Sequence, residues 1–151
     1  MNNESGFTLI EMLVVIAILM IVAYIAVPIS INQIQTNKLE TEAKKLKSSM
    51  QTQQQYAYSA NENSAYGIKY NTNSYVLYSG NTYATAVLTD TTTFPSGITI
   101  SQTSLANSST ELNFSKNSFR PDTTGSITLV DGVNSYSVTV NSEGLIEIVK
   151  N

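Results

Sequence analysis

The chain of 151 residues contains no cysteine and no histidine. Without cysteine there is no disulfide to staple the fold, no thiol nucleophile and no thiolate ligand for a metal. Without histidine, the commonest general base and metal ligand of proteins is missing. Asp90, Asp122 and Asp131 are too widely spaced to form the dense alternation of a calcium loop. We therefore expect a protein that is not an enzyme and that holds no cofactor and no metal.

Positive charge is also scarce. Eight lysines and arginines face eleven acidic residues, which gives a formal net charge of −3. Nucleic-acid binders usually show a basic face, so no specific nucleic-acid site is expected. The lysines between Lys38 and Lys47 are interrupted by Glu40 and Glu42. This pattern indicates a solvated helix face or a contact between subunits.

One long segment is almost free of charge. From Phe7 to Val27 the only charged residue is Glu11. As a helix this segment is about 31 Å long, which matches the hydrocarbon core of a bilayer. A carboxylate deep in lipid costs roughly 2.5–3.5 kcal/mol, so it marks a candidate functional site that needs a partner. Cleavage between Gly6 and Phe7 would create that partner, an α-amino group four residues before Glu11. The two groups can pair within one chain or between neighbouring helices.

The string Gly6-Phe7-Thr8-Leu9-Ile10-Glu11, between a short polar leader and an apolar helix, resembles the type IV prepilin and pseudopilin family. The resemblance implies that prepilin peptidase cuts after Gly6 and methylates the new terminus at Phe7. It also implies that Glu11 is the carboxylate used in filament assembly and that Pro28 kinks the helix. A plain signal anchor with an incidental glutamate is the alternative.

The leader differs from the usual basic prepilin leader, because it contains Glu4 and neither lysine nor arginine. An ordinary secretory signal fits less well, since no A-x-A cleavage site follows the apolar run. The lysines follow the span, so the positive-inside rule gives little help with orientation. The resemblance alone implies a cytoplasmic leader and an extracytoplasmic head.

Beyond Pro28 the chain becomes amphipathic. Apolar residues recur at three/four spacing, which predicts a helix from about Phe7 to about Tyr58 that proline bends and does not end. Glu40 and Lys44 form an i,i+4 pair in the favourable order. Because only one face of this part is apolar, it needs a partner surface. The predicted stripe consists of Leu39, Ala43, Leu46, Met50 and Ala57, with Gln53 in the remaining slot.

The segment from 61 to 151 reads as β structure. Asn71-Thr72-Asn73 separates two strand patterns and predicts a hairpin. The Ser/Thr-rich stretches 90–95 and 101–110 are expected to be loops. Short strands after one long helix predict an α+β fold with mostly antiparallel pairing, in which the helix packs on the head like the handle of a ladle. The expected strands are 66–70, 74–78, 82–88, 97–101, 111–114, 126–130, 136–140 and 145–149.

Four parts are therefore expected. Residues 1–6 form a cleaved leader, 7–28 a transmembrane helix, 29–60 its amphipathic continuation, and 61–151 an extracytoplasmic β-rich head. The patterns around Tyr66-Gly67-Ile68-Lys69-Tyr70 and Phe94-Pro95-Ser96-Gly97-Ile98 resemble H-type pseudopilins and FimT-like minor pilins. In those relatives the head consists of two packed sheets.

These resemblances imply a structural subunit of a type IV pilus-like filament, of the minor or initiating kind. A pseudopilin of a type II secretion system and a major pilin are alternatives, and a membrane-anchored adhesin that never polymerises is less compatible with Glu11. The implied partners are prepilin peptidase, other pilin subunits in a hetero-polymer, an inner-membrane assembly platform, and the bilayer before assembly. The implied location is single-pass in the cytoplasmic membrane, then in a cell-surface or periplasmic filament.

Overall fold

The computed structural model describes residues 8–106 and 108–151, without the side chains of 25–37. The chain divides into two compact units, residues 1–35 and 36–151. Helix α1 (Leu9–Tyr58) contributes to both units. Its end confirms the predicted boundary near Tyr58.

The described part of the first unit is a helical stretch that is apolar on all sides. Every described residue from Thr8 to Tyr24 is exposed, including leucine, isoleucine, valine and methionine side chains. Within the part of the chain that the structure describes, no helix has the length and apolarity needed to cross a membrane. The predicted span 7–28 includes Phe7 and the side chains of 25–28, which lie outside the described residues. The kink at Pro28 stays a prediction for the same reason.

The second unit confirms the predicted apolar stripe. Leu39, Ala43, Leu46, Met50 and Ala57 are wholly buried along α1. They follow three/four spacing, with the buried Gln53 filling the slot between Met50 and Ala57. The unit therefore supplies the partner surface that the amphipathic pattern requires.

Charged residues lie beside this stripe on the same helical segment. Glu40 and Lys44 form the expected ion pair, with 2.6 Å between Nζ and Oε1. Hydrogen bonding and the opposite charge lower the pKa of Glu40 and raise that of Lys44. Tyr136 donates a further hydrogen bond to Glu40.

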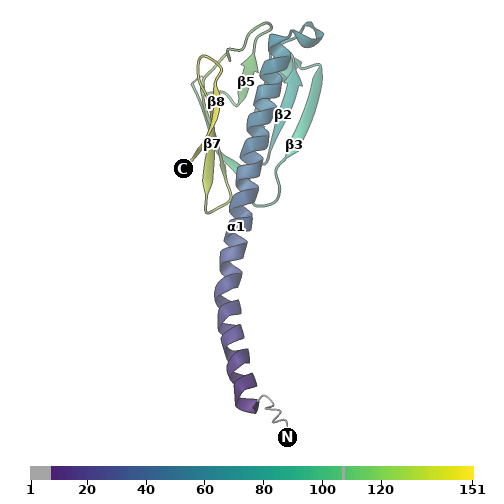
Figure 1. The fold of residues 1–151 in the computed structure, drawn as a ribbon. Helices are drawn as coiled ribbons and strands as arrows, with labels where there is room; N and C mark the ends of the chain where they lie inside the picture. Colours follow the sequence, from purple (N-terminus) through teal and green to yellow (C-terminus); the bar gives the residue numbers. More distant parts are fainter. Residues whose placement is uncertain (1–7, 107) are drawn as a thin grey trace. The chain divides into compact units, whose positions relative to one another are not determined.

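The strands form two four-stranded sheets in which every pairing is antiparallel, which confirms an α+β fold. Figure 1 shows α1 with β2 and β3 on one side and β7 and β8 on the other. The first sheet has the order β3-β2-β1-β5, with β1 Tyr66–Asn71, β2 Ser74–Ser79, β3 Leu88–Thr93 and β5 Glu111–Phe114. The second has the order β4-β6-β7-β8, with β4 Thr99–Leu105, β6 Gly125–Val130, β7 Ser135–Val140 and β8 Ile146–Lys150.

The hairpin predicted around residues 71–73 is present. Strands β1 and β2 pair from Tyr66–Ser79 to Asn71–Ser74, which leaves a two-residue turn at Thr72 and Asn73. Asn71 therefore belongs to the strand and not to the loop.

The prediction of a strand at 82–88 and a loop at 90–95 is wrong. Residues Tyr83–Thr85 form a 3₁₀ turn (η2), and β3 runs through Thr93. A second 3₁₀ turn, η1, covers Asn61–Asn63. Threonine is a good strand former, and β3 is a largely exposed edge strand that shows no apolar alternation. Its backbone pairing with β2, and not side-chain burial, makes it a strand.

A polar network holds η2 in place. The Glu111 carboxylate accepts hydrogen bonds from the Tyr83 backbone N–H at 3.1 Å and from Lys69 at 3.0 Å. The Lys69 ammonium also lies 5.0 Å from the centre of the Tyr83 ring. Burial opposes ionisation of Glu111, but these hydrogen bonds and the lysine charge outweigh it and lower its pKa.

The expected strand at 97–101 and loop at 101–110 are also wrong in part. Strand β4 runs from Thr99 to Leu105, and its register shifts between Ile100 and Gln102. This bulge places the buried Ile100 and Leu105 five positions apart, which breaks the period of two that marks a strand in sequence.

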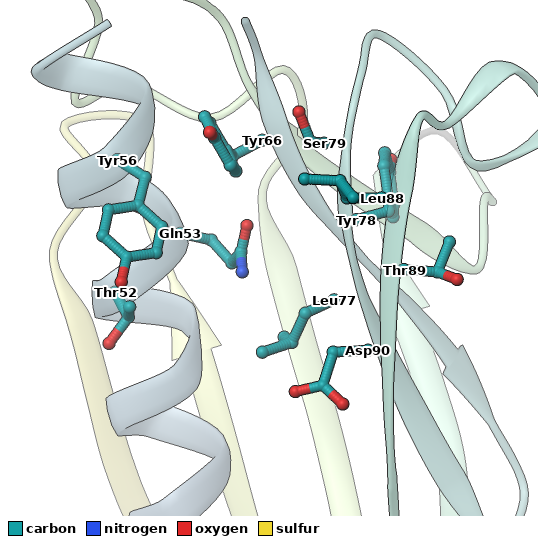
Figure 2. A pocket seen from close by; sticks show the side chains of 10 residues that line it. All are labelled: Thr52, Gln53, Tyr56, Tyr66, Leu77, Tyr78, Ser79, Leu88, Thr89 and Asp90. Carbon is teal, nitrogen blue, oxygen red and sulfur yellow. The ribbon is translucent and has the colours of Figure 1, made fainter. Parts of the chain in front are cut away.

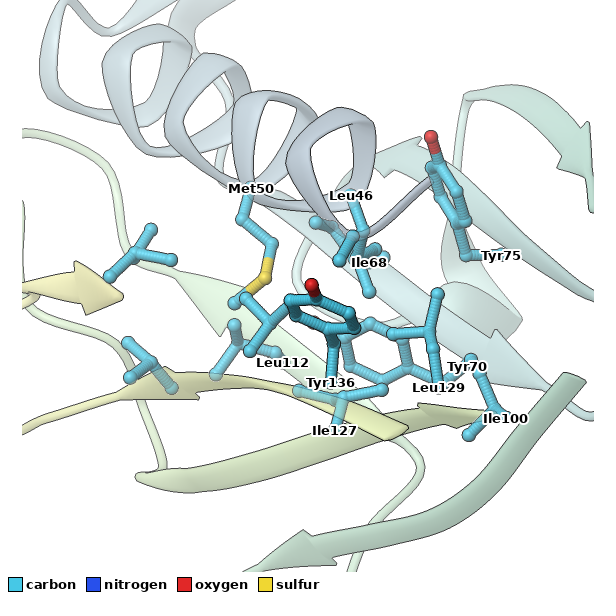
Figure 3. Packing of buried hydrophobic residues seen from close by; sticks show 14 of the residues in the cluster. Leu46, Met50, Ile68, Tyr70, Tyr75, Ile100, Leu112, Ile127, Leu129 and Tyr136 are labelled. Atoms are coloured by element: carbon cyan, nitrogen blue, oxygen red, sulfur yellow. The ribbon is translucent and has the colours of Figure 1, made fainter. Parts of the chain in front are cut away.

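The main core of the second unit lies between α1 and both sheets. In Figure 3, Leu46 and Met50 project from the helix towards Ile68, Leu112 and Tyr136, which come from three different strands. One contiguous cluster of buried apolar residues therefore joins the helix and the two sheets.

Candidate assembly site at the start of the helix

Thr8 and Glu11 bind each other across the first turn of α1. The Glu11 Oε2 atom accepts hydrogen bonds from the backbone N–H and the hydroxyl of Thr8, both at 2.9 Å. In return, the Glu11 backbone N–H donates to the Thr8 hydroxyl at 3.3 Å. Thr8 directly precedes the first helical residue, Leu9, so the two residues form a capping box.

The capping box explains why the helix starts here. The first backbone N–H groups of a helix have no partner within the helix, and a threonine cap contributes about 0.5–2 kcal/mol to helix stability. A carboxylate in the first turn also interacts favourably with the helix dipole. The charge pattern of the sequence indicates only an amine partner for Glu11 and does not predict Thr8. The signal that could have found Thr8 is the Thr-x-x-Glu spacing, which is typical of such a cap.

The carboxylate keeps one oxygen for another donor. Only Oε2 of Glu11 takes part in the contacts with Thr8, and Oε1 accepts no hydrogen bond from the residues that the structure describes. A carboxylate has about four acceptor positions, so binding to Thr8 leaves it able to accept a proton donor from elsewhere.

The other predicted site residues are not tested by this geometry. The cleavage site Gly6–Phe7 and the methylation site Phe7 lie outside the described residues. Pro28 falls within α1, but its side chain is likewise outside the description. Thr8 and Glu11 are thus the part of the candidate site that the structure brings together.

The surroundings of Glu11 are apolar. Leu9 is 84 % exposed, and Ile10, Met12 and Val14 are also exposed, so these side chains surround the carboxylate on different faces of the helix. A helix that is apolar all round is normally buried in a large core or in a membrane. This segment therefore has an apolar surface all round, with one acidic group near its end.

Comparison with known proteins bears on this end of the chain only. No curated protein and no solved structure matches the chain. Residues 1–27 match the family model described as the prokaryotic N-terminal methylation motif. The matched range contains Gly6, Phe7 and the Thr8–Glu11 capping box. The match indicates an N-terminus of the type IV pilin-like prepilin kind.

Proposed function

We propose that the chain is a structural subunit of a type IV pilus-like filament. It is made as a prepilin, cut by prepilin peptidase after Gly6, methylated at Phe7, and assembled by lateral packing of helices. The observation that supports this proposal best is the start of α1, where one capped carboxylate, Glu11, lies in a helix that is apolar and exposed on every side.

The apolar surface of α1 requires two successive environments in this proposal. Before assembly, residues 7–28 lie in the cytoplasmic membrane, and the head, residues 61–151, lies outside the cytoplasm. During assembly, the same side chains leave lipid and pack against the helices of neighbouring subunits. Packing between helices replaces contacts with lipid tails, so the apolar surface stays out of water throughout.

Glu11 gives this packing its register. Cleavage leaves a charged amine on Phe7, and an unpaired charge is expensive in an apolar environment. Glu11 of a neighbouring subunit neutralises that amine through its unoccupied Oε1, while Oε2 remains with Thr8. The pairing is possible only at one axial offset between helices, so it selects the correct register.

The head supports a narrower assignment within this class. Two antiparallel sheets packed on the second half of α1 are compatible with the H-type pseudopilin and FimT-like minor pilin resemblance. We therefore propose a minor or initiating subunit in a hetero-polymer, recruited by an inner-membrane platform, with a structural and not a catalytic role.

A pseudopilin of a type II secretion system is the second candidate, because the same N-terminal motif serves both. Deletion of the gene separates them: loss of surface fibres favours the pilus, and loss of protein export favours secretion.

Processing is tested by the intact mass of the native protein. The mature chain is expected to begin at Phe7, without residues 1–6, and to bear one methyl group on its amine. A mature chain that starts at Met1, or after Val27, would contradict the proposal.

Assembly is tested with two substitutions of Glu11. Glu11→Val removes both the charge and the cap, whereas Glu11→Gln removes the charge and keeps an acceptor for Thr8. Both variants are expected to insert into the membrane and to be cleaved. In sheared fibres, an immunoblot against this subunit is expected to show less of either variant than of the wild type. If Glu11→Gln enters fibres normally and Glu11→Val does not, Glu11 serves only as a cap. Normal entry of both variants would refute an assembly role.

A further inference from the structure

We propose that the head binds the arginine side chain of a partner protein in a groove between α1 and strands β2 and β3. The groove has a volume of about 310 Å³ and lies within the second unit. Figure 2 shows its two walls, with Gln53 and Tyr56 on the helix and Leu77, Leu88 and Asp90 on the strands.

The first observation is a buried acceptor without a donor. Gln53 is only 5 % exposed, and its Oε1 atom has no hydrogen-bond partner within the described part of the chain. In Figure 2 its carboxamide points from α1 into the groove. An unpaired acceptor at this depth is costly, so a ligand that donates a hydrogen bond there is favoured.

The second observation is an unpaired negative charge on the opposite wall. Asp90 lies beside Leu77 in the register of β2 and β3, and its carboxylate faces the groove in Figure 2. Among the described residues it takes part in none of the ion pairs. The groove thus presents two oxygen acceptors and one negative charge, which are complementary to a cationic group with several N–H donors.

The third observation is the shape and lining of the groove. Its volume is at the low end for a small-molecule site, at about 300 Å³, so it is suited to one side chain. Leu77 and Leu88 offer apolar surface for a carbon stem. Tyr56 is 42 % exposed and lines the groove beside Tyr66, with 5.5 Å between the ring centres, so the groove also has aromatic surface.

These features favour arginine over lysine. A guanidinium is planar, stacks on aromatic rings and can reach two acceptors at once, whereas an ammonium is a compact and strongly hydrated charge. The chain's own arginine, Arg120, forms an ion pair with Glu143 at 2.6 Å and is not among the residues that line the groove.

The position of the groove allows a partner to approach. Strand β3 is an edge of its sheet, and Leu88 is 55 % exposed at the mouth of the groove. A segment of another protein can therefore lie along this edge and insert one side chain. Arginine is enriched among the residues that dominate protein–protein binding energy.

The test uses the full chain, labelled with ¹⁵N in detergent micelles, and the peptide acetyl-Gly-Arg-Gly-amide as the probe. The side-chain amide signal of Gln53 and the backbone signals of Leu77 and Asp90 are expected to shift with a saturable dependence on peptide. The same peptide with citrulline, which is neutral and nearly isosteric, is expected to bind much more weakly. Asp90→Asn removes the charge that strengthens the hydrogen bond to the guanidinium, so this variant is expected to bind the arginine peptide about tenfold more weakly.

Two variants control for charge and for folding. Glu147→Gln removes one negative charge at an exposed position of β8 and is expected to leave binding unchanged. Gln53→Met removes the acceptor and keeps the length of the side chain, so the fold should persist, as judged by signal dispersion, while binding weakens. Equal binding of the citrulline peptide, unchanged binding in Asp90→Asn, or an equal loss in Glu147→Gln would overturn the proposal. Peptide binding does not depend on processing or assembly, so its failure would leave the proposed filament role untouched.

Discussion

The docking of α1 on the head can be tested by removing one side chain from the stripe. Leu46 is wholly buried, and it projects from the helix into the cluster that contains Ile68 and Tyr136. Leu46→Ala removes apolar contacts and leaves a cavity between the helix and the sheets. Such substitutions cost about 3–5 kcal/mol in well-packed cores. For a domain of this size, a loss of 3 kcal/mol lowers Tm by roughly 10 °C or more.

The assay follows tyrosine fluorescence of the full chain in detergent during heating. Every tyrosine except Tyr24 lies within residues 36–151, so the signal reports the head and not the apolar start of the helix. Leu145→Ala is the matched control, because Leu145 is 56 % exposed and its truncation is expected to change stability by less than about 0.5 kcal/mol. If Leu46→Ala melts at the same temperature as Leu145→Ala, then the helix does not pack on the head.

Two further predictions concern the head. Gly125 has φ +149°, and an added Cβ would lie 2.1 Å from the Ser104 carbonyl oxygen, so Gly125→Ala is expected to lower Tm strongly. Gly132 has φ +90°, but an added Cβ there would meet no atom within 4 Å. Gly132→Ala should therefore cost only about 1 kcal/mol of backbone strain. Equal melting temperatures of the two variants would contradict this reasoning. The pKa of Glu111 in the folded protein lies below its ordinary value of 4.5. The ionised carboxylate therefore contributes to folding stability above pH 4.5, and this contribution is lost as the pH falls through the lowered pKa of the folded state. The stability difference between wild type and Glu111→Gln should therefore shrink in acid, and a difference that grows as the pH falls would refute the assignment.

The sequence predicted the elements whose side chains repeat with a clear period. The stripe from Leu39 to Ala57 has helical spacing and is buried as expected. Strand β5 was predicted with its observed bounds, and β6, β7 and β8 within one residue at each end. In these segments, local propensity and the pattern of burial agree, so the period in the sequence indicates the structure.

Prediction failed where burial does not follow the local pattern. Strand β3 is polar and exposed, and it is a strand because the backbone of β2 pairs with it. Strand β4 contains a bulge that shifts its apolar residues out of phase. At the candidate site, the Thr-x-x-Glu spacing indicates the contact between Thr8 and Glu11, whereas the charge pattern alone points only to an amine partner.

By itself, the sequence determined the apolar start of α1, the single carboxylate within it, and the match to the methylation motif, because these depend only on the order of residues along one helix. The tertiary structure alone decided which strands are neighbours, and so which polar groups meet. Gln53 and Asp90 are far apart in the sequence, and the residues next to each of them form no recognisable binding motif. They face one groove only because α1 packs beside β2 and β3, since burial and unpaired acceptors are created by packing between distant segments.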